Sequence, residues 1–221
     1  MPPDERFRGV LFDMDGLLLD TERLILEAAE RTAVALALDD LSSTFRAMIG
    51  MRGDRAMPML EEALGGRITL GRFRSEWSVH MDELERGGVP IRPGVVELLE
   101  RLGARELPCA VATSTRRANA CAQLERAGLA RFFASVVGGD DVVEPKPDPE
   151  VYLRAAASLG IEPREACAFE DSGPGTRAAV AAGATVVQVP DLVPPSAELR
   201  ALGHTIAPDV LAGARRVGLI D

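Results

Sequence analysis

The sequence predicts an α/β protein in which a doubly wound parallel sheet forms the core and an α-helical cap is inserted into it. Over most of the 221 residues, short and almost continuously apolar runs alternate with helical patterns. This alternation is typical of parallel strands that are buried on both faces and connected by helices. Between the first two runs, about seventy residues show helical patterns only, far more than a crossover helix needs.

The core strands are predicted from apolar runs that lack polar/apolar alternation. They cover residues 9–13, 109–113, 135–138, 166–169 and 185–189. Helices are expected between them at residues 94–104, 115–127, 148–160 and 174–182. Gly128, Gly160 and Gly183 follow three of these helices, at the position where a residue with a left-handed backbone commonly ends a helix.

The long helical stretch is interpreted as a cap. Helical spacing of apolar residues covers 21–37, 53–64 and 69–86, with glycines at the breaks. We therefore assign residues 21–90 to a helical cap domain, and residues 1–20 and 91–221 to the α/β core domain. Glycines and prolines in the stretch 87–94 mark the returning linker as a candidate hinge.

Composition and charge limit the possible partners. The formal net charge is −9 at pH 7, whereas nucleic acids and anionic membranes attract basic proteins. No uncharged apolar run reaches the roughly 20 residues that span a bilayer. Cys109, Cys121 and Cys167 form no C-x-x-C pair, which favours buried free thiols in a reducing compartment. We expect a cytoplasmic protein, a monomer or weak dimer, that binds a small molecule and neither nucleic acid nor membranes.

The first chemical motif is Phe12-Asp13-Met14-Asp15-Gly16, directly after an apolar run. If the strand ends at Asp13, its carboxylate lies at the C-terminal edge of the sheet, where open α/β sheets bind ligands. The following turn can then bring Asp15 to the same place. Two adjacent carboxylates are costly unless a cation neutralises them, so the pair indicates a Mg²⁺-type site. An Asp-rich turn without a metal is the alternative for this motif alone.

Three further motifs follow predicted strands. Thr113-Ser114 offers a hydroxyl and free amides at a helix start, which suits a phosphoryl oxygen or, alternatively, a simple helix cap. Lys146 lies between Pro145 and Pro147, which hold the backbone extended. Glu170-Asp171 places an acidic pair at a strand end before a glycine-containing turn.

Because parallel strands end at one edge of a sheet, these motifs would bring together several carboxylates, an ammonium group, a hydroxyl and helix-terminal amides. This set suits phosphoryl transfer, which depends mainly on positioning and charge neutralisation. An aspartate nucleophile would divide the reaction into two steps through an acyl phosphate. Mg²⁺ and Lys146 would reduce the repulsion between this carboxylate and the phosphate.

The four motifs, in this order and around a helical insertion, resemble those of the haloacid dehalogenase (HAD) superfamily of phosphohydrolases over essentially the whole chain. The cap position is similar to that of the subclass with a helical cap between the first two motifs. The stretch from Phe12 to Leu24 and the Lys146-Pro147-Asp148-Pro149 segment are similar to those of phosphatases acting on sugar phosphates and pseudouridine 5′-monophosphate. The resemblance implies a Rossmann-like core and Mg²⁺ as cofactor.

The resemblance also implies which acidic residues do the chemistry. Asp13 would be the nucleophile and a metal ligand. Asp15 would be the general acid and base, with its backbone carbonyl on the metal. Asp171, with Glu170 beside it, would complete the metal shell.

For the phosphoryl group, the resemblance implies binding by Thr113 and the amide of Ser114, with Lys146 orienting the nucleophile and balancing charge. Substrate choice would depend on the cap and the loops that face it. Arg52 and Arg116 are candidates for binding a distal anionic or hydroxyl group of the substrate.

The implied substrate is a small phosphorylated metabolite, either a sugar phosphate or a nucleoside or pseudouridine monophosphate. The alternative is a phosphomutase similar to β-phosphoglucomutase, which shares all four motifs. Such mutases carry a cap histidine where this chain has Ile25. Dehalogenases lack an acid two residues after the nucleophile, and phospho-receiver domains lack both that acid and the cap, so Asp15 disfavours both classes.

Overall fold

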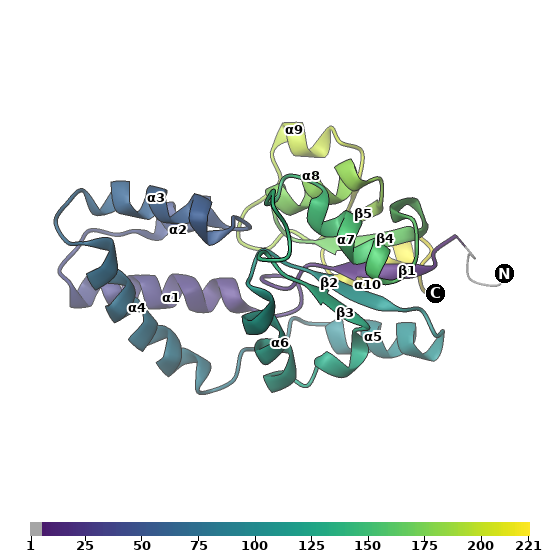
Figure 1. The fold of residues 1–221 in the computed structure, drawn as a ribbon, viewed down its shortest axis with the longest axis horizontal. Helices are drawn as coiled ribbons and strands as arrows, with labels where there is room; N and C mark the ends of the chain where they lie inside the picture. Colours follow the sequence, from purple (N-terminus) through teal and green to yellow (C-terminus); the bar gives the residue numbers. More distant parts are fainter. Residues whose placement is uncertain (1–5) are drawn as a thin grey trace.

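The computed structural model describes residues 6–221, so the first five residues of the predicted core segment 1–20 lie outside the described part. A six-stranded sheet with the order β3-β2-β1-β4-β5-β6 lies between layers of helices (Figure 1). All paired neighbours in the sheet are parallel. The predicted doubly wound α/β core is therefore confirmed.

The strands agree with the apolar runs to within one residue at each end. They are β1 (Gly9–Phe12), β2 (Cys109–Ala112), β3 (Ser135–Val137), β4 (Ala166–Glu170), β5 (Thr185–Gln188) and β6 (Thr205–Ile206). The edge strand β6 was not predicted because two residues are too few to produce a recognisable apolar run.

Helices of the core begin and end within two residues of the four predicted segments, and two short helices near the C-terminus are additional. They are α5 (Val95–Ala104), α6 (Arg117–Arg126), α7 (Glu150–Ser158), α8 (Gly173–Ala182), α9 (Ala197–Arg200) and α10 (Val210–Arg216). Two 3₁₀ turns, η1 (Ala130–Phe132) and η2 (Pro163–Glu165), precede β3 and β4.

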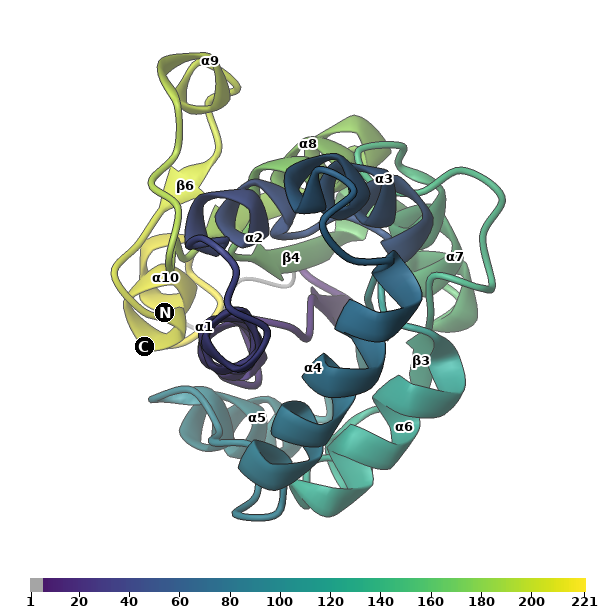
Figure 2. The same ribbon diagram turned by 90° about the vertical axis from the view of Figure 1, so that its left-hand side faces the viewer.

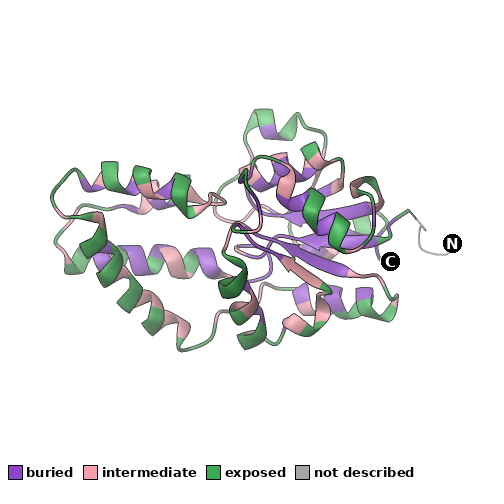
Figure 3. Cartoon of the chain, viewed as in Figure 1, coloured by how far each residue is buried: buried purple, intermediate pink, exposed green. Residues whose placement is uncertain are grey.

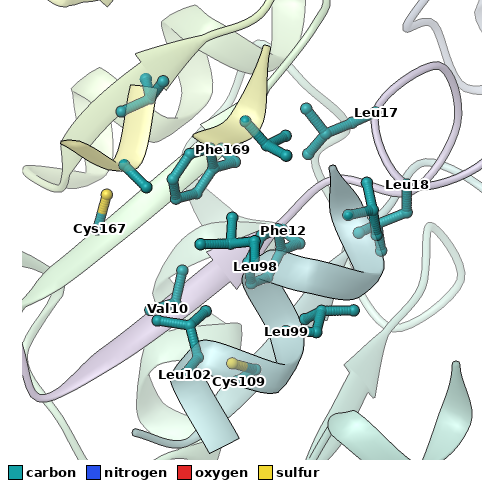
Figure 4. Close-up of a cluster of buried hydrophobic side chains, with 14 of the residues drawn as sticks. Val10, Phe12, Leu17, Leu18, Leu98, Leu99, Leu102, Cys109, Cys167 and Phe169 are labelled. Atoms are coloured by element: carbon teal, nitrogen blue, oxygen red, sulfur yellow. The ribbon is translucent and has the colours of Figure 1, made fainter. Parts of the chain in front are cut away.

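Alternate strand residues pack on opposite faces of the sheet, as the period of two in a strand requires. Val10 and Phe12 of β1 belong to the apolar cluster under α5, α6 and α10 (Figure 4). Leu11 between them belongs to the cluster under α7 and α8. The rings of Phe12 and Phe169 stack with centroids 5.2 Å apart, and Figure 3 shows the buried strands between the two helical layers. Burial on both faces explains why the strands appear in the sequence as unbroken apolar runs.

Four helices between β1 and β2 form a separate lobe (Figures 1 and 2). They are α1 (Thr21–Ala35), α2 (Ser42–Met48), α3 (Gly53–Leu64) and α4 (Leu70–Glu85). The lobe has its own apolar cluster, which includes Leu26, Phe45, Leu60 and Phe73. We assign this lobe to the cap. The seven-residue helix α2 was not predicted.

A salt-bridge cluster joins the two chain segments between cap and core. The Asp191 side chain, only 4% exposed, accepts two hydrogen bonds from Arg23 (2.7 and 2.9 Å) and pairs with Arg92 at 2.9 Å. Arg23 also pairs with Asp20 at 2.7 Å. Leu192, next to Asp191, packs against the apolar cluster of the cap. The loop after β5 therefore contacts both linker segments and the cap interior.

The C-terminal ends of β1 and β4 lie where the order of the strands in the sheet reverses direction. From β1 the chain continues through the cap to β2 on one side of β1, and it later returns to β4 on the other side. At such a reversal of strand order, helices diverge and leave a crevice in which α/β proteins bind ligands. Within residues 6–221, none of the helices has both the length and the apolar character needed to cross a bilayer.

Gly213→Ala tests how closely α10 packs on the sheet. A Cβ atom at this position would overlap Cγ1 of the buried Val187 and lie 3.3 Å from Cβ of Ala207. We expect the free energy of unfolding, measured by chemical denaturation, to fall by about 1–3 kcal/mol through overpacking. The control is Gly103→Ala in α5, where a Cβ meets nothing within 4 Å; it should raise stability by up to about 1 kcal/mol. Equal effects at both positions would contradict the packing argument.

Candidate active site

Lys146 connects two strand ends through a buried pair of salt bridges. Asp13 is the first residue after β1, and its amide donates to the carbonyl of Phe169 at 3.0 Å, which fixes Asp13 at the sheet edge. Nζ of Lys146, from the connection between β3 and α7, lies 2.5 Å from Oδ1 of Asp13 and 2.6 Å from Oε1 of Glu170. All three side chains are buried. One ammonium group thus joins three separate segments of the chain.

The Glu170 carboxylate has hydrogen-bond donors on both oxygens. Oε1 accepts a hydrogen bond from the hydroxyl of Tyr152 at 2.9 Å, in addition to its contact with Lys146. Oε2 accepts hydrogen bonds from the amide and the hydroxyl of Ser172 at 3.0 and 2.9 Å. A Cβ atom on Gly175 would overlap this carboxylate, so the first turn of α8 needs a glycine there. Glu170 is thereby positioned to hold Lys146 in place.

An acidic cluster that could hold a metal ion lies at the same edge of the sheet. One oxygen each of Asp13, Glu170 and Asp171 lies within 4.8 Å of the other two. Gln188 donates to the backbone carbonyl of Asp171 at 3.2 Å, but within the described part of the chain no residue donates a hydrogen bond to the Asp171 carboxylate or to Oδ2 of Asp13. These two carboxylates therefore have oxygens available for a cation, and oxygen ligands of this kind are preferred by Mg²⁺.

Burial dominates the electrostatics of these groups. It raises the pKa of Asp13 and of Asp171 well above the usual range of an aspartate, and neighbouring carboxylates add to the increase. Burial also raises the pKa of Glu22 to about 9, with the charges of Asp13 and Asp15 adding to it. For Lys146, burial opposes the charged form, but Asp13 and Glu170 outweigh it and raise the pKa of the ammonium group. The cluster has excess negative charge that a divalent cation would neutralise.

Asp15 is held by three threonine hydroxyls. Oδ1 accepts a hydrogen bond from Oγ1 of Thr21 at 2.8 Å. Oδ2 accepts hydrogen bonds from Oγ1 of Thr115 at 2.7 Å and from Oγ1 of Thr113 at 3.2 Å. Oγ1 of Thr113 also accepts a hydrogen bond from the backbone amide of Thr115 at 3.0 Å. Thr21 begins helix α1 of the cap, whereas Thr113 and Thr115 follow β2. The Asp15 carboxyl is therefore fixed from both the cap and the core.

The substrate-binding candidates lie where cap loop and core loops meet. Oγ of Ser114 donates to the carbonyl of Gly50 in the cap at 3.3 Å. Arg52 donates to both carboxylate oxygens of Asp54 at 2.8 and 2.7 Å. Its Nη1 also reaches the carbonyls of three core residues, Gly139, Val142 and Val143, at 3.2–3.4 Å. Arg116 is exposed and directly precedes α6.

Several residues of the site were not predicted from the sequence. Thr21 and Thr115 each contribute a hydroxyl to Asp15, and Tyr152 contributes one to Glu170. Thr115 stands two residues after Thr113, a spacing that would have been a usable signal. Nothing local marks Tyr152, which reaches the site from the inner face of α7.

The fold and this geometry can be compared with known proteins. Residues 10–189 match the family model described as haloacid dehalogenase-like hydrolase. The chain belongs to this family. Among relatives of this HAD-like chain, a phosphorylated carbohydrates phosphatase of Thermotoga maritima is 36% identical over 79% of this chain and 81% of its own length. The fructose-1-phosphate phosphatase YqaB of Escherichia coli is 33% identical over 84% of this chain and 97% of its own.

A crystal structure of a Thermotoga maritima protein assigned as a β-phosphoglucomutase has a TM-score of 0.78 and 31% sequence identity to this HAD-like chain. It covers 96% of this chain, and 99% of that structure is matched. The resemblance drawn from the four motifs is thus confirmed, and so are the Rossmann-like core and the expectation of a hydrolase. The assignment of roles to individual residues stays a prediction.

Lys146→Met tests whether the ion cluster stabilises this HAD-like fold. Removing the ammonium group leaves the buried carboxylates of Asp13 and Glu170 without their cation. Breaking a buried ion pair in this way lowers the free energy of unfolding by about 3–5 kcal/mol. We expect that loss in the free energy of unfolding, with partial recovery in the double variant Lys146→Met/Glu170→Gln. The matched control is Arg177→Met, which breaks an exposed pair with Glu198 at 3.4 Å and should cost at most about 1 kcal/mol. A loss for Lys146→Met no larger than the control would contradict the argument.

Proposed function

We propose that this protein is a Mg²⁺-dependent phosphatase that hydrolyses a small phosphorylated metabolite through a phosphoaspartyl intermediate on Asp13. A sugar phosphate or a nucleoside or pseudouridine monophosphate is the substrate class. The observation that carries the proposal is the position of Asp13, which pairs with Lys146 and lies in one cluster with the carboxylates of Glu170 and Asp171, while three threonine hydroxyls hold Asp15. The phosphatases among the relatives support the same class of reaction.

The residues present fit a divalent metal ion. The buried carboxylates of Asp13 and Asp171 have oxygens without protein donors, and the cluster has more negative charge than Lys146 can balance. We propose that these two carboxylates and the backbone carbonyl of Asp15 hold Mg²⁺, which when bound reduces the repulsion between nucleophile and phosphate. Glu170 was also a candidate ligand; because its oxygens accept hydrogen bonds, we assign it to holding Lys146.

The first chemical step is attack of an Asp13 oxygen on phosphorus. The new O–P bond forms as the ester P–O bond breaks, and the leaving oxygen takes a proton from Asp15. Lys146, 2.5 Å from Oδ1 of Asp13, keeps the carboxylate oriented. Thr113 and the amide of Ser114 are placed at the start of the segment leading into α6, and we assign them to the phosphoryl oxygens.

The second step is hydrolysis of the phosphoaspartate. Asp15, now deprotonated, takes a proton from water, whose oxygen attacks phosphorus and releases phosphate and the Asp13 carboxylate. Asp15 is thereby protonated again for the next cycle, so the same carboxyl serves as acid and then as base. The hydroxyls of Thr21 and Thr115 hold it in one position for both steps, while the longer contact from Thr113 at 3.2 Å gives way when Thr113 donates to the phosphoryl group.

Substrate selection is assigned to the loops between cap and core. Arg52 and Arg116 remain our candidates for a distal anionic or hydroxyl group. In the present arrangement the guanidinium of Arg52 holds Asp54 and the loop 139–143, so it already links the cap to the core. A cap closed over the substrate would exclude bulk water from the reaction.

A phosphomutase is the second candidate, favoured by the structural similarity to a protein assigned as a β-phosphoglucomutase. The position of the mutase cap histidine is occupied by Ile25, whose side chain packs against the apolar cluster of the cap and cannot transfer a proton. A phosphate-release screen over sugar and nucleotide phosphates, with and without Mg²⁺, tests the proposal. Conversion of a hexose 1-phosphate to its 6-phosphate without net phosphate release would favour the mutase.

Asp13→Asn should abolish turnover and leave the fold intact. The amide is a poor nucleophile, so we expect kcat to fall by about 10⁴-fold or more, while Tm in metal-free buffer changes little because the side chain keeps its shape and Lys146 keeps its buried pair with Glu170. Phosphate release and thermal unfolding are measured on the same preparation. Retained turnover in a folded variant would rule out Asp13 as the nucleophile.

Asp15→Asn should slow both proton transfers, by about 10²–10⁴-fold for substrates with an alcohol leaving group. With p-nitrophenyl phosphate the leaving group needs no proton, so the first step should persist while hydrolysis of the intermediate slows. We therefore expect a burst of p-nitrophenol followed by accumulation of phosphorylated protein, detected by mass spectrometry. Normal phosphate release from an alkyl phosphate would refute the role of Asp15 as acid and base.

A further inference from the structure

Glu22 is a buried acid to which the proposed mechanism gives no role. It is the second residue of α1 and only 5% exposed. Its Oε2 atom is shielded from solvent, and no residue in the described range 6–221 forms a hydrogen bond to it. A buried carboxylate oxygen without a hydrogen-bond partner is unfavourable in its ionised form. This oxygen of Glu22 is therefore available as an acceptor for a group other than a protein side chain.

The side chain of Glu22 points to the acidic cluster. A Cβ atom built on Gly16 would lie 3.0 Å from the carboxyl carbon of Glu22 and would overlap Oδ2 of Asp171. Both carboxyl groups thus approach Gly16, which has a φ of +82° in the turn after Asp15. The cation nearest to the cluster, Lys146, is already placed between Asp13 and Glu170 at 2.5 and 2.6 Å.

The position of Glu22 in a helix does not by itself explain this burial. An acidic residue in the first turn of a helix interacts favourably with the helix dipole, but an exposed side chain does so equally well. Direct coordination of the metal is also not indicated. The group of carboxylate oxygens that lie within 4.8 Å of one another consists of Asp13, Glu170 and Asp171 and does not extend to Glu22.

We propose that Glu22 is an outer-sphere ligand of the divalent cation: its unpartnered oxygen accepts a hydrogen bond from a water molecule bound to the metal. This inference rests on the metal site of the proposed function. Mg²⁺ usually keeps several of its waters in proteins, and side chains that bind such waters contribute to metal affinity. Because Glu22 belongs to α1 and the inner ligands follow strands, the hydration shell of the metal would connect cap and core.

The test is Mg²⁺ binding by isothermal titration calorimetry without substrate. Glu22→Gln keeps the shape of the side chain and removes its charge, and it should weaken Mg²⁺ binding by about 10–100-fold. Glu22→Ala should weaken binding at least as much. The matched control is Glu30→Gln, an exposed residue of the same helix, which should bind Mg²⁺ like the wild type. Asp171→Asn, a variant of a proposed inner ligand, is the positive control.

Thermal unfolding provides a second measurement that does not depend on activity. In EDTA, Glu22→Gln should have a Tm equal to or above that of the wild type, because an unpartnered buried carboxylate has been removed. The increase in Tm caused by Mg²⁺, which reflects binding to the folded state, should be smaller than in the wild type. A marked fall of Tm in EDTA would instead identify a packing role for Glu22 and overturn the proposal.

The outcomes separate this proposal from the function on which it rests. If the wild type binds no Mg²⁺, the metal site itself is wrong. If the wild type binds Mg²⁺ and Glu22→Gln binds it equally tightly, only the role of Glu22 is refuted. Unchanged Mg²⁺ affinity with a raised KM would assign Glu22 to the substrate, which also overturns the proposal.

Discussion

A single ammonium group, Nζ of Lys146, determines the geometry of this site, because it is buried between carboxylates at the C-terminal ends of two different strands. Buried charges are tolerated only when they are paired and hydrogen-bonded. Glu170 meets this condition through Tyr152 and Ser172, so it can act as a fixed anchor. Asp13 is then held at one oxygen and available at the other.

The Asp15 carboxyl depends on a second network, and this one includes the cap. Two of its hydroxyl partners follow β2, whereas the third, Thr21, begins the first cap helix. The position of the Asp15 carboxyl, which we propose transfers the proton, is consequently set by how the cap is placed on the core. Arg52 and Ser114 form further hydrogen bonds between these parts. Direct hydrogen bonds therefore link the placement of the cap to the position of the Asp15 carboxyl.

Most of the core could be predicted from the sequence because its strands are buried on both faces and therefore unbroken in their apolar character. The convergence of Asp13, Lys146 and Asp171 followed from parallel strands that end at one edge. Thr21, Thr115 and Tyr152 could not be predicted in the same way. Threonine and tyrosine are common in such segments, and only the packing of α1 and α7 on the sheet brings these hydroxyls to the acids. Strand β6 and helices α2, α9 and α10 are too short for a periodic pattern to stand out.

The loop after β5 shows that cap and core do not separate cleanly at the linkers. Leu192 belongs to the core by its place in the chain, yet it packs in the apolar interior of the cap, while its neighbour Asp191 holds Arg23 and Arg92 on the two connecting segments. A chimera that receives residues 21–90 from a relative would therefore acquire a cap interior that is not shaped for Leu192 of this chain. Exchange of caps to alter substrate choice requires that residues 189–195 be transplanted together with them.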